Sequence, residues 1–185
     1  MNNLENFIFE QAKRVIQKID QNELSDIYAY SFYVSNVDDD PRLPSLTIGY
    51  NTETNLNENI EGASSKNEAK WNYAFWLQNE LVLIGEDEDS QDLITEWIEN
   101  QDLYYTDEDE DDNFDTCLEK GEKITKSFVS TLIDIVQRLH KEHITELPIL
   151  IHELEYYDEI KNQNVLANGI ERVKEFAGWI DNGME

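Results

Sequence analysis

Positively charged residues are scarce in this sequence. Fourteen lysines and arginines stand against 41 aspartates and glutamates, which gives a formal net charge of −27. Nucleic-acid binding depends on lysine and arginine side chains that neutralise phosphates, so this composition argues against a nucleic-acid partner. Anionic membrane surfaces are disfavoured for the same reason, and no apolar run approaches the roughly 20 residues of a membrane-spanning helix. We therefore expect neither a nucleic acid nor a membrane as the partner.

Cysteine, proline and glycine are also few, at one, three and seven residues. The lone Cys117 cannot form an internal disulfide, and the first residues have neither the basic n-region nor the apolar h-region of a secretory signal. Both features indicate a cytoplasmic protein. The chain contains no glycine-rich phosphate loop and no GxSxG, HExxH or CxxC motif. From the sequence we therefore assign no catalytic residue, no metal site and no cofactor.

Aromatic residues, by contrast, are plentiful. Apolar residues make up 39% of the chain and aromatic residues 11%, including four tryptophans and nine tyrosines. Disordered chains carry far less ring surface, so this sequence has the material for a hydrophobic core despite its charge. At 185 residues, a single domain over residues 1–185 is expected.

The first third of the chain predicts a helix followed by a hairpin. Apolar residues at helical spacing predict an amphipathic helix over residues 4–19. The aromatic and β-branched run from Ile27 to Val34 predicts a buried strand. Residues 43–50 alternate well enough to form its antiparallel partner, with Pro44 confined to a strand start or an edge. Residues 51–67 show no periodicity and are assigned no element.

The rest of the chain is richer in helices. Trp71 to Trp76, followed by Leu81 to Ile84, fits either a strand pair or a strand that leads into a helix. The further predicted elements are helices over residues 93–98, 124–139 and 165–180, and a buried strand in the first half of the segment from Ile149 to Tyr157. We expect this late strand to join the early sheet. The order predicts an α+β fold, in which an N-terminal helix and several later helices pack on a mainly antiparallel sheet.

The negative charge is concentrated in one part of the chain. From Trp71 to Glu119 there is no lysine or arginine over 49 residues. One interpretation is that residues 86–115 form an acidic, partly flexible and solvated insertion around a short helix. The other is that they form a landing surface for a basic protein, with tryptophans as anchors. The candidate binding residues are the acidic Glu86, Asp87, Asp107, Asp109 and Asp111, together with Trp71, Trp76 and Trp97.

Two metal-site interpretations are weaker. A calcium loop that begins at Glu108 has glutamates at two early ligand positions and Asn113 where glycine is expected, which disfavours an EF-hand. His140 and His143 lie three apart at a predicted helix end, where histidine is also favoured by the helix dipole. His152 falls on the predicted late strand and has no predicted partner.

An enzyme remains the alternative. Its pocket would lie near Asn51, Glu53 and Trp71, with Glu53 as the general acid or base of a small-molecule-binding or hydrolytic site.

Three local patterns resemble a known family. They are Asn51-Thr52-Glu53 after the second predicted strand, the segment from Lys70 to Trp76, and Leu147 to Leu154 followed by Ala167-Asn168. In this order they are similar to motifs of the DUF4303 family of uncharacterised bacterial proteins. The resemblance implies a small bacterial cytoplasmic α+β protein, and an immunity or antitoxin-like role. We therefore expect a non-enzymatic cytoplasmic binding protein that has no cofactor and whose acidic face docks a basic partner.

Overall fold

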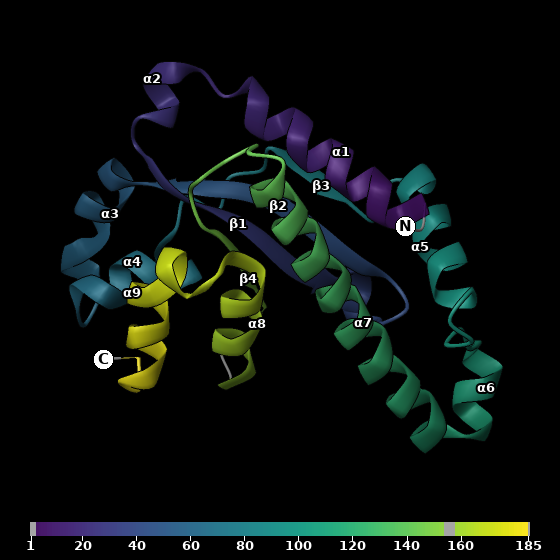
Figure 1. Ribbon diagram of the computed structural model, residues 1–185. Coiled ribbons are helices and arrows are strands. Elements are labelled where there is room, and N and C mark those ends of the chain that lie inside the picture. Colours follow the sequence, from purple (N-terminus) through teal and green to yellow (C-terminus); the bar gives the residue numbers. More distant parts are fainter. Residues whose placement is uncertain (1–2, 154–157, 185) are drawn as a thin grey trace.

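The computed structural model describes residues 3–153 and 158–184 (Figure 1). Its helices are α1 (Asn3–Lys18), α2 (Gln21–Leu24), α3 (Glu53–Asn59), α4 (Lys66–Trp71), α5 (Glu88–Glu99), α6 (Asp107–Asp112), α7 (Phe114–Lys141), α8 (Asp158–Asn168) and α9 (Ile170–Asp181). Its strands are β1 (Ile27–Asn36), β2 (Pro44–Thr52), β3 (Val82–Ile84) and β4 (Ile149–His152), and short 3-10 turns occupy Val37–Asp39, Ile60–Gly62 and Tyr73–Phe75. The α+β class is confirmed.

The four strands form one sheet in the order β3-β2-β1-β4. The hairpin of β1 and β2 is antiparallel as predicted, and β3 pairs antiparallel with β2. β4 pairs with β1 in parallel, from Tyr30 opposite Ile149 to Tyr33 opposite His152. The late strand therefore joins the early sheet, and the sheet is mixed, with two antiparallel pairings and one parallel pairing.

One face of the sheet carries the larger hydrophobic core. Alternate residues of β1, such as Tyr30 and Phe32, point to this face and are fully buried. The apolar stripes of α1, α5 and α7 pack over them, and Figure 1 shows α1 and α7 crossing the sheet together. A fully buried side chain of this size contributes about 1.5–3 kcal/mol relative to an exposed one, so this face supplies much of the driving force for folding.

The opposite face carries a second, aromatic cluster. Ala29 of β1 and Leu150 of β4 lie under Trp71, Phe176 and Trp179, which come from α4 and α9. The edge of the Trp71 ring meets Phe176, with ring centroids 6.2 Å apart. Helices therefore cover both faces of the sheet, and the sheet forms the middle layer.

The outer edge of β4 is covered by side chains of α8. The Asn168 amide accepts a hydrogen bond from Ile149 N at 2.8 Å and donates one to Ile149 O at 2.8 Å. Asn164 does the same for Ile151, at 2.7 and 3.0 Å. Residues four apart on a helix rise about 6.0 Å, which nearly matches the roughly 6.6 Å between alternate strand residues. Two amides of one helix can therefore pair with one strand edge.

Two predicted elements are wrong. The segment from Trp71 to Trp76 is the end of α4 followed by a 3-10 turn, because its rings pack on the sheet rather than forming part of it. The closing helix is two helices, because Gly169 adopts a φ of +78° that breaks the helix between α8 and α9. Leu154 to Tyr157, the second half of the predicted strand segment, lie outside the described residues.

Among helices in the described ranges, none is both long and apolar enough to cross a membrane.

Candidate protein-binding surface

The acidic segment folds into one end of the molecule. α5, α6 and the first turns of α7 lie at this end, away from α3, α4 and α9 (Figure 1). We call α6 and the α7 residues Phe114 to Glu122, with the loop between β1 and β2, the acidic surface. Every residue of α6 is acidic, and the residues from Glu108 to Thr116 are exposed apart from the half-buried Glu110.

A capping box allows six consecutive acids to form a helix. The Thr106 hydroxyl accepts from Asp109 N at 3.1 Å, and the Asp109 carboxylate accepts from Thr106 N at 2.8 Å. Negative charge is also favourable in the first turn of a helix, where backbone N–H groups are unpaired. The hydrogen bonds from the Thr106 backbone and hydroxyl lower the pKa of Asp109 below its ordinary value.

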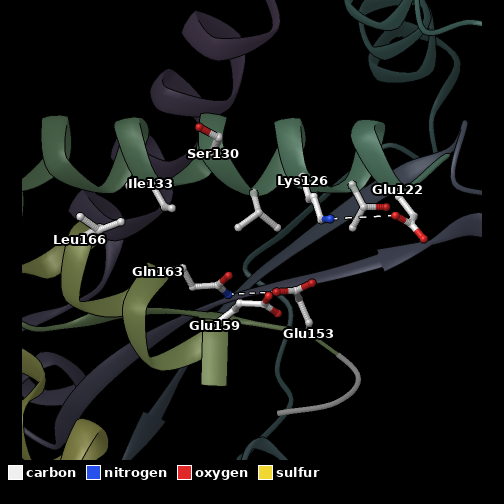
Figure 2. Close-up of a pocket in the computed structure, with 10 residues that line it drawn as sticks. Glu122, Lys126, Ser130, Ile133, Glu153, Glu159, Gln163 and Leu166 are labelled. Atoms are coloured by element: carbon white, nitrogen blue, oxygen red, sulfur yellow. Dashed lines mark hydrogen bonds and ion pairs between the residues drawn. The ribbon is translucent and has the colours of Figure 1, made fainter. Parts of the chain in front are cut away.

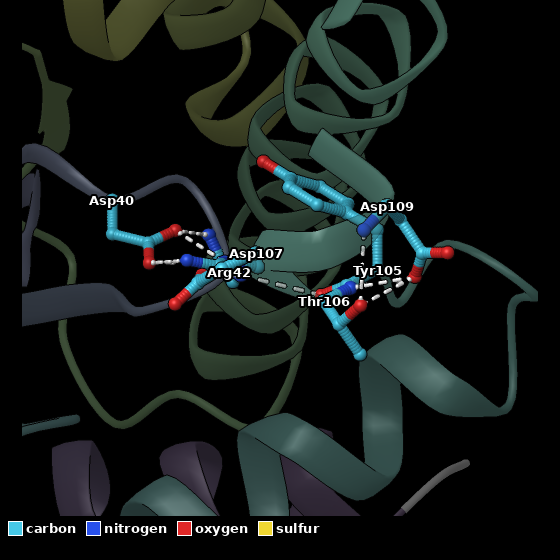
Figure 3. A network of polar contacts seen from close by, with 6 residues as sticks. All are labelled: Asp40, Arg42, Tyr105, Thr106, Asp107 and Asp109. Carbon is cyan, nitrogen blue, oxygen red and sulfur yellow. Dashed lines mark hydrogen bonds and ion pairs between the residues drawn. The ribbon is translucent and has the colours of Figure 1, made fainter. Parts of the chain in front are cut away.

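Arg42 binds this helix to the hairpin loop (Figure 3). Its guanidinium contacts the Asp40 carboxylate at 2.6 Å and the Asp107 carboxylate at 2.7 Å, and it lies 5.0 Å from the centroid of the Tyr105 ring. Partial burial acts to raise the pKa of Asp40, but hydrogen bonds and charge from Arg42 outweigh it and hold the pKa below its ordinary value. The Arg42 guanidinium is thus already paired with two carboxylates of its own chain.

Two exposed apolar side chains stand within the acidic surface. Phe114 is 59% exposed and Leu118, one turn further along α7, is 53% exposed. They line a pocket of about 590 Å³ with Pro41, Arg42 and Glu110. Gly121 and Pro41 also line this pocket, and α7 approaches the hairpin loop closely there, because a Cβ on Gly121 would lie only 2.8 Å from Pro41 Cγ. A pocket of this kind can hold an apolar side chain while carboxylates surround it.

The predicted acidic residues divide into two groups. Asp87 caps α5 by accepting from Ser90 N at 3.0 Å, and hydrogen bonds from the Ser90 hydroxyl and backbone lower its pKa. Asp107 and Asp109 hold Arg42 and the start of α6, as described above. Glu86 and Asp111 are exposed. Asp87, Asp107 and Asp109 therefore stabilise the local structure of this region, in addition to the negative charge that they contribute.

The three predicted tryptophan anchors lie in the core. Trp71, Trp76 and Trp97 are 4%, 5% and 6% exposed. Trp97 meets the core residue Phe128 edge-on at 5.9 Å, and Trp76 donates its indole N–H to Lys70 O at 3.0 Å. Buried indoles cannot present a ring to a partner. We therefore replace them with Phe114 and Leu118 as candidate anchors.

The residues of the alternative enzyme pocket do not share an opening. Glu53 is exposed at the start of α3. Asn51 is fully buried, and its amide donates to the Tyr28 hydroxyl at 2.9 Å and accepts from Asn55 Nδ2 at 2.9 Å. Trp71 belongs to the aromatic cluster. Asn51 therefore binds neighbouring chain segments together, and Glu53 has the exposure of an ordinary surface carboxylate.

The histidines and the cysteine have structural surroundings. His140 is buried, with Nδ1 3.1 Å from Thr145 O and Nε2 3.0 Å from Asn168 Oδ1. His143 is exposed beyond the end of α7, so the two histidines do not form a metal pair. Cys117 is buried in the larger core. Within residues 3–153 and 158–184, no group of three or more histidine, cysteine or acidic side chains is arranged to hold a metal ion.

Sequence reasoning missed Arg42, Phe114 and Leu118. For the two apolar residues a signal was present, because they stand four apart within an otherwise acidic stretch. Arg42 gave no such signal, since Asp107 lies 65 positions along the chain and only the fold brings the two together.

Comparison with known proteins gives no relative: no protein-family model, no curated protein and no solved structure matches this chain. The resemblance to the DUF4303 family stays a prediction.

Proposed function

We propose that this chain is a non-enzymatic binding protein whose acidic surface docks a basic protein. The observation that carries this proposal is the placement of Phe114 and Leu118, two exposed apolar side chains beside a pocket, within a surface in which acidic residues far outnumber Arg42 and Lys120.

The charge would act on the rate of encounter. Seventeen acidic residues lie between Glu80 and Glu119, with no lysine or arginine among them. A field of one sign steers an oppositely charged partner and can raise the association rate constant from about 10⁵–10⁶ to 10⁸ M⁻¹ s⁻¹ or more at low salt. It also repels acidic proteins, nucleic acids and anionic membranes, so it selects the partner as well as attracting it.

The apolar pair would act on the lifetime of the complex. Exposed charge pairs contribute only about 0–1 kcal/mol each, so charge alone gives a short-lived complex. Burying Phe114 and Leu118 against a partner removes apolar surface from water and adds about 1.5–3 kcal/mol for each side chain that becomes fully buried. The partner should therefore carry an apolar side chain flanked by lysines or arginines.

An immunity or antitoxin-like role in the cytoplasm is the most specific form of this proposal. It rests on the resemblance to the DUF4303 family, and such a role requires tight binding without chemistry. The absence of recognisable catalytic motifs from the sequence agrees with it.

The test is affinity capture from the cytosol of the source organism at about 50 and 500 mM NaCl, followed by kinetics with the captured protein. A charge variant combines Glu108→Gln, Glu110→Gln, Asp111→Asn and Asp112→Asn. It leaves Asp107 and Asp109 in place because they hold Arg42 and cap α6. We expect this variant to associate roughly tenfold more slowly at low salt and at the wild-type rate at high salt.

A matched control removes the same number of charges elsewhere. It carries Glu→Gln at the exposed positions Glu10, Glu58, Glu61 and Glu171. Phe114→Ala with Leu118→Ala should instead raise the dissociation rate, and Leu77→Ala is its control because Leu77 is also exposed but lies outside the acidic surface. Equal kinetics for the charge variant and its control, or no basic protein captured at low salt, would overturn the proposal. If a partner is captured, its toxicity with and without this chain tests the immunity role.

A further inference from the structure

A second cavity lies on another side of α7. A groove of about 730 Å³ runs between α7 and α8 and reaches the end of β4 (Figure 2). Its volume is within the roughly 300–1,000 Å³ of small-molecule sites. The acidic surface does not include α8 or β4, so this groove is distinct from the proposed protein-binding pocket, although Glu122 and Thr125 border both.

The groove is apolar at one end and polar at the other. Ile133 and Leu166 lie at the apolar end in Figure 2, and Val129 is a further apolar residue that lines the groove. Leu166 lines the groove and is 63% exposed, so its side chain is accessible to a ligand. Glu153, Glu159 and Glu122 lie toward the opposite end.

One carboxylate of the polar end is held in place. Gln163 is 9% exposed, and its Nε2 donates to Glu153 Oε1 at 3.0 Å. A nearly buried amide that orients an acceptor fixes its geometry before any ligand arrives, which lowers the cost of binding. The second oxygen of Glu153 remains an acceptor with lone pairs available.

The charge of the groove favours a cation. Three carboxylates face one lysine, Lys126, whose Nζ lies 4.0 Å from Glu122 in a pair that is exposed on both sides. That pair is weak, and the four groups together carry a formal charge of −2. The described histidine, cysteine and acidic side chains form no metal-holding group, so an organic cation fits the groove better than a metal ion.

We propose that the α7–α8 groove binds a small primary amine with an apolar body. The ammonium group lies between Glu153 and Glu159, where it donates hydrogen bonds to carboxylate oxygens. The apolar body lies along Val129, Ile133 and Leu166. An ammonium group has three donors and no acceptor, which matches a site that presents carboxylates.

The test uses the full chain, isotope-labelled for NMR titration in about 150 mM NaCl, with n-hexylamine as the probe. Ethylamine carries the same charge without the apolar body, and hexanoate carries the body with the opposite charge. Because each buried methylene contributes about 0.8 kcal/mol, or roughly fourfold in affinity, hexylamine should bind at least about tenfold more tightly than ethylamine. The shifted resonances should belong to Val129, Ile133, Gln163 and Leu166.

Two variants separate the two ends of the site. Glu153→Gln with Glu159→Gln should weaken hexylamine at least about tenfold, because charge-assisted hydrogen bonds are lost. Leu166→Ser should weaken hexylamine and leave ethylamine unchanged. Leu166 and Glu159 are exposed, and at the half-buried Glu153 a glutamine keeps an oxygen that can accept from Gln163, so these changes are compatible with folding. Glu171→Gln and Leu77→Ser are the matched controls outside the groove, and both should bind hexylamine as the wild type does.

Three outcomes would overturn the proposal. Equal affinities for hexylamine and ethylamine would mean only that cations collect around an acidic chain. Tighter binding of hexanoate than of hexylamine would reverse the assigned charge preference. Shifts outside α7, α8 and β4, for example in the acidic surface, would place the amine elsewhere and leave the protein-docking proposal to its own test.

Discussion

His152 makes the stability of this protein depend on pH in a way that can be calculated. It lies on β4, is fully buried, and packs against Tyr73 and Trp76 with ring centroids 4.9 Å away in both cases. Burial disfavours the charged imidazolium and lowers the pKa of His152 from 6.5 to about 3. The folded protein therefore keeps this ring neutral at pH values where the unfolded chain protonates it.

The sign follows from proton uptake. Between pH 6.5 and about 3 the unfolded state binds a proton at His152 that the folded state does not, so acidification favours unfolding. The stability that depends on a neutral His152 is fully present above pH 6.5 and is lost progressively as the pH falls toward 3. From pH 7 to 4.5 about two pH units of this window are crossed, at about 1.36 kcal/mol each, so His152 alone should cost about 2.7 kcal/mol.

The assay is urea unfolding, followed by tryptophan fluorescence, at pH 7 and at pH 4.5. Carboxylates also begin to protonate in this range, so the measured quantity is the difference between the wild type and His152→Gln, which does not titrate. The free energy of unfolding of the wild type should fall by about 2.7 kcal/mol more than that of the variant. His143→Gln, at an exposed histidine, should behave as the wild type. Equal pH dependence in the wild type and His152→Gln would refute the reasoning.

Three further predictions concern the fold. Asn168→Ala should lower the free energy of unfolding, measured in urea, by about 3 kcal/mol. It leaves the buried N–H and C=O of Ile149 without their partner, and each unsatisfied group costs about 1–3 kcal/mol. A loss no larger than that of Asn67→Ala, at an exposed asparagine, would contradict this. Gly49→Ala should cost about 1–3 kcal/mol in the same assay, because a Cβ would lie 2.4 Å from Asn79 O, and an unchanged midpoint would show that the contact is loose. Raising NaCl from about 0.05 to 0.5 M should raise the urea midpoint by screening repulsion in a chain of net charge −27, and a falling midpoint would disprove this account.

Elements with a clear local period could be predicted from the sequence. The 3.6-residue period marks α1 and α7, and the run of aromatic and β-branched residues marks β1. The α+β class followed from their order. The prediction for Trp71 to Trp76 was wrong because this segment has the composition of a strand, whereas its rings pack on a sheet face made by other residues. The parallel pairing of β4 with β1 joins residues more than one hundred positions apart, which no local pattern encodes.

The charge of the candidate binding surface could be predicted from the sequence, but the apolar residues that could anchor a partner could not. An unbroken acidic stretch can be read directly from the sequence, whereas the burial of Trp97 depends on α5 packing against Phe128 of α7. Aromatic residues serve cores and interfaces equally well, so their identity alone does not distinguish the two. The 59% exposure of Phe114 likewise depends on the packing around the start of α7 and not on its residue type.

The two amides of α8 that pair with β4 also decide how this sheet meets other chains. An open strand edge is a template on which a second chain can polymerise, and natural proteins guard against this. Here Asn164 and Asn168 occupy the outward N–H and C=O groups of Ile151 and Ile149, as a fifth strand would. The opposite edge belongs to β3, which is only three residues long. The sheet is thus terminated on both sides, and a concentrated solution of this protein should resist fibre formation even when salt screens its charge.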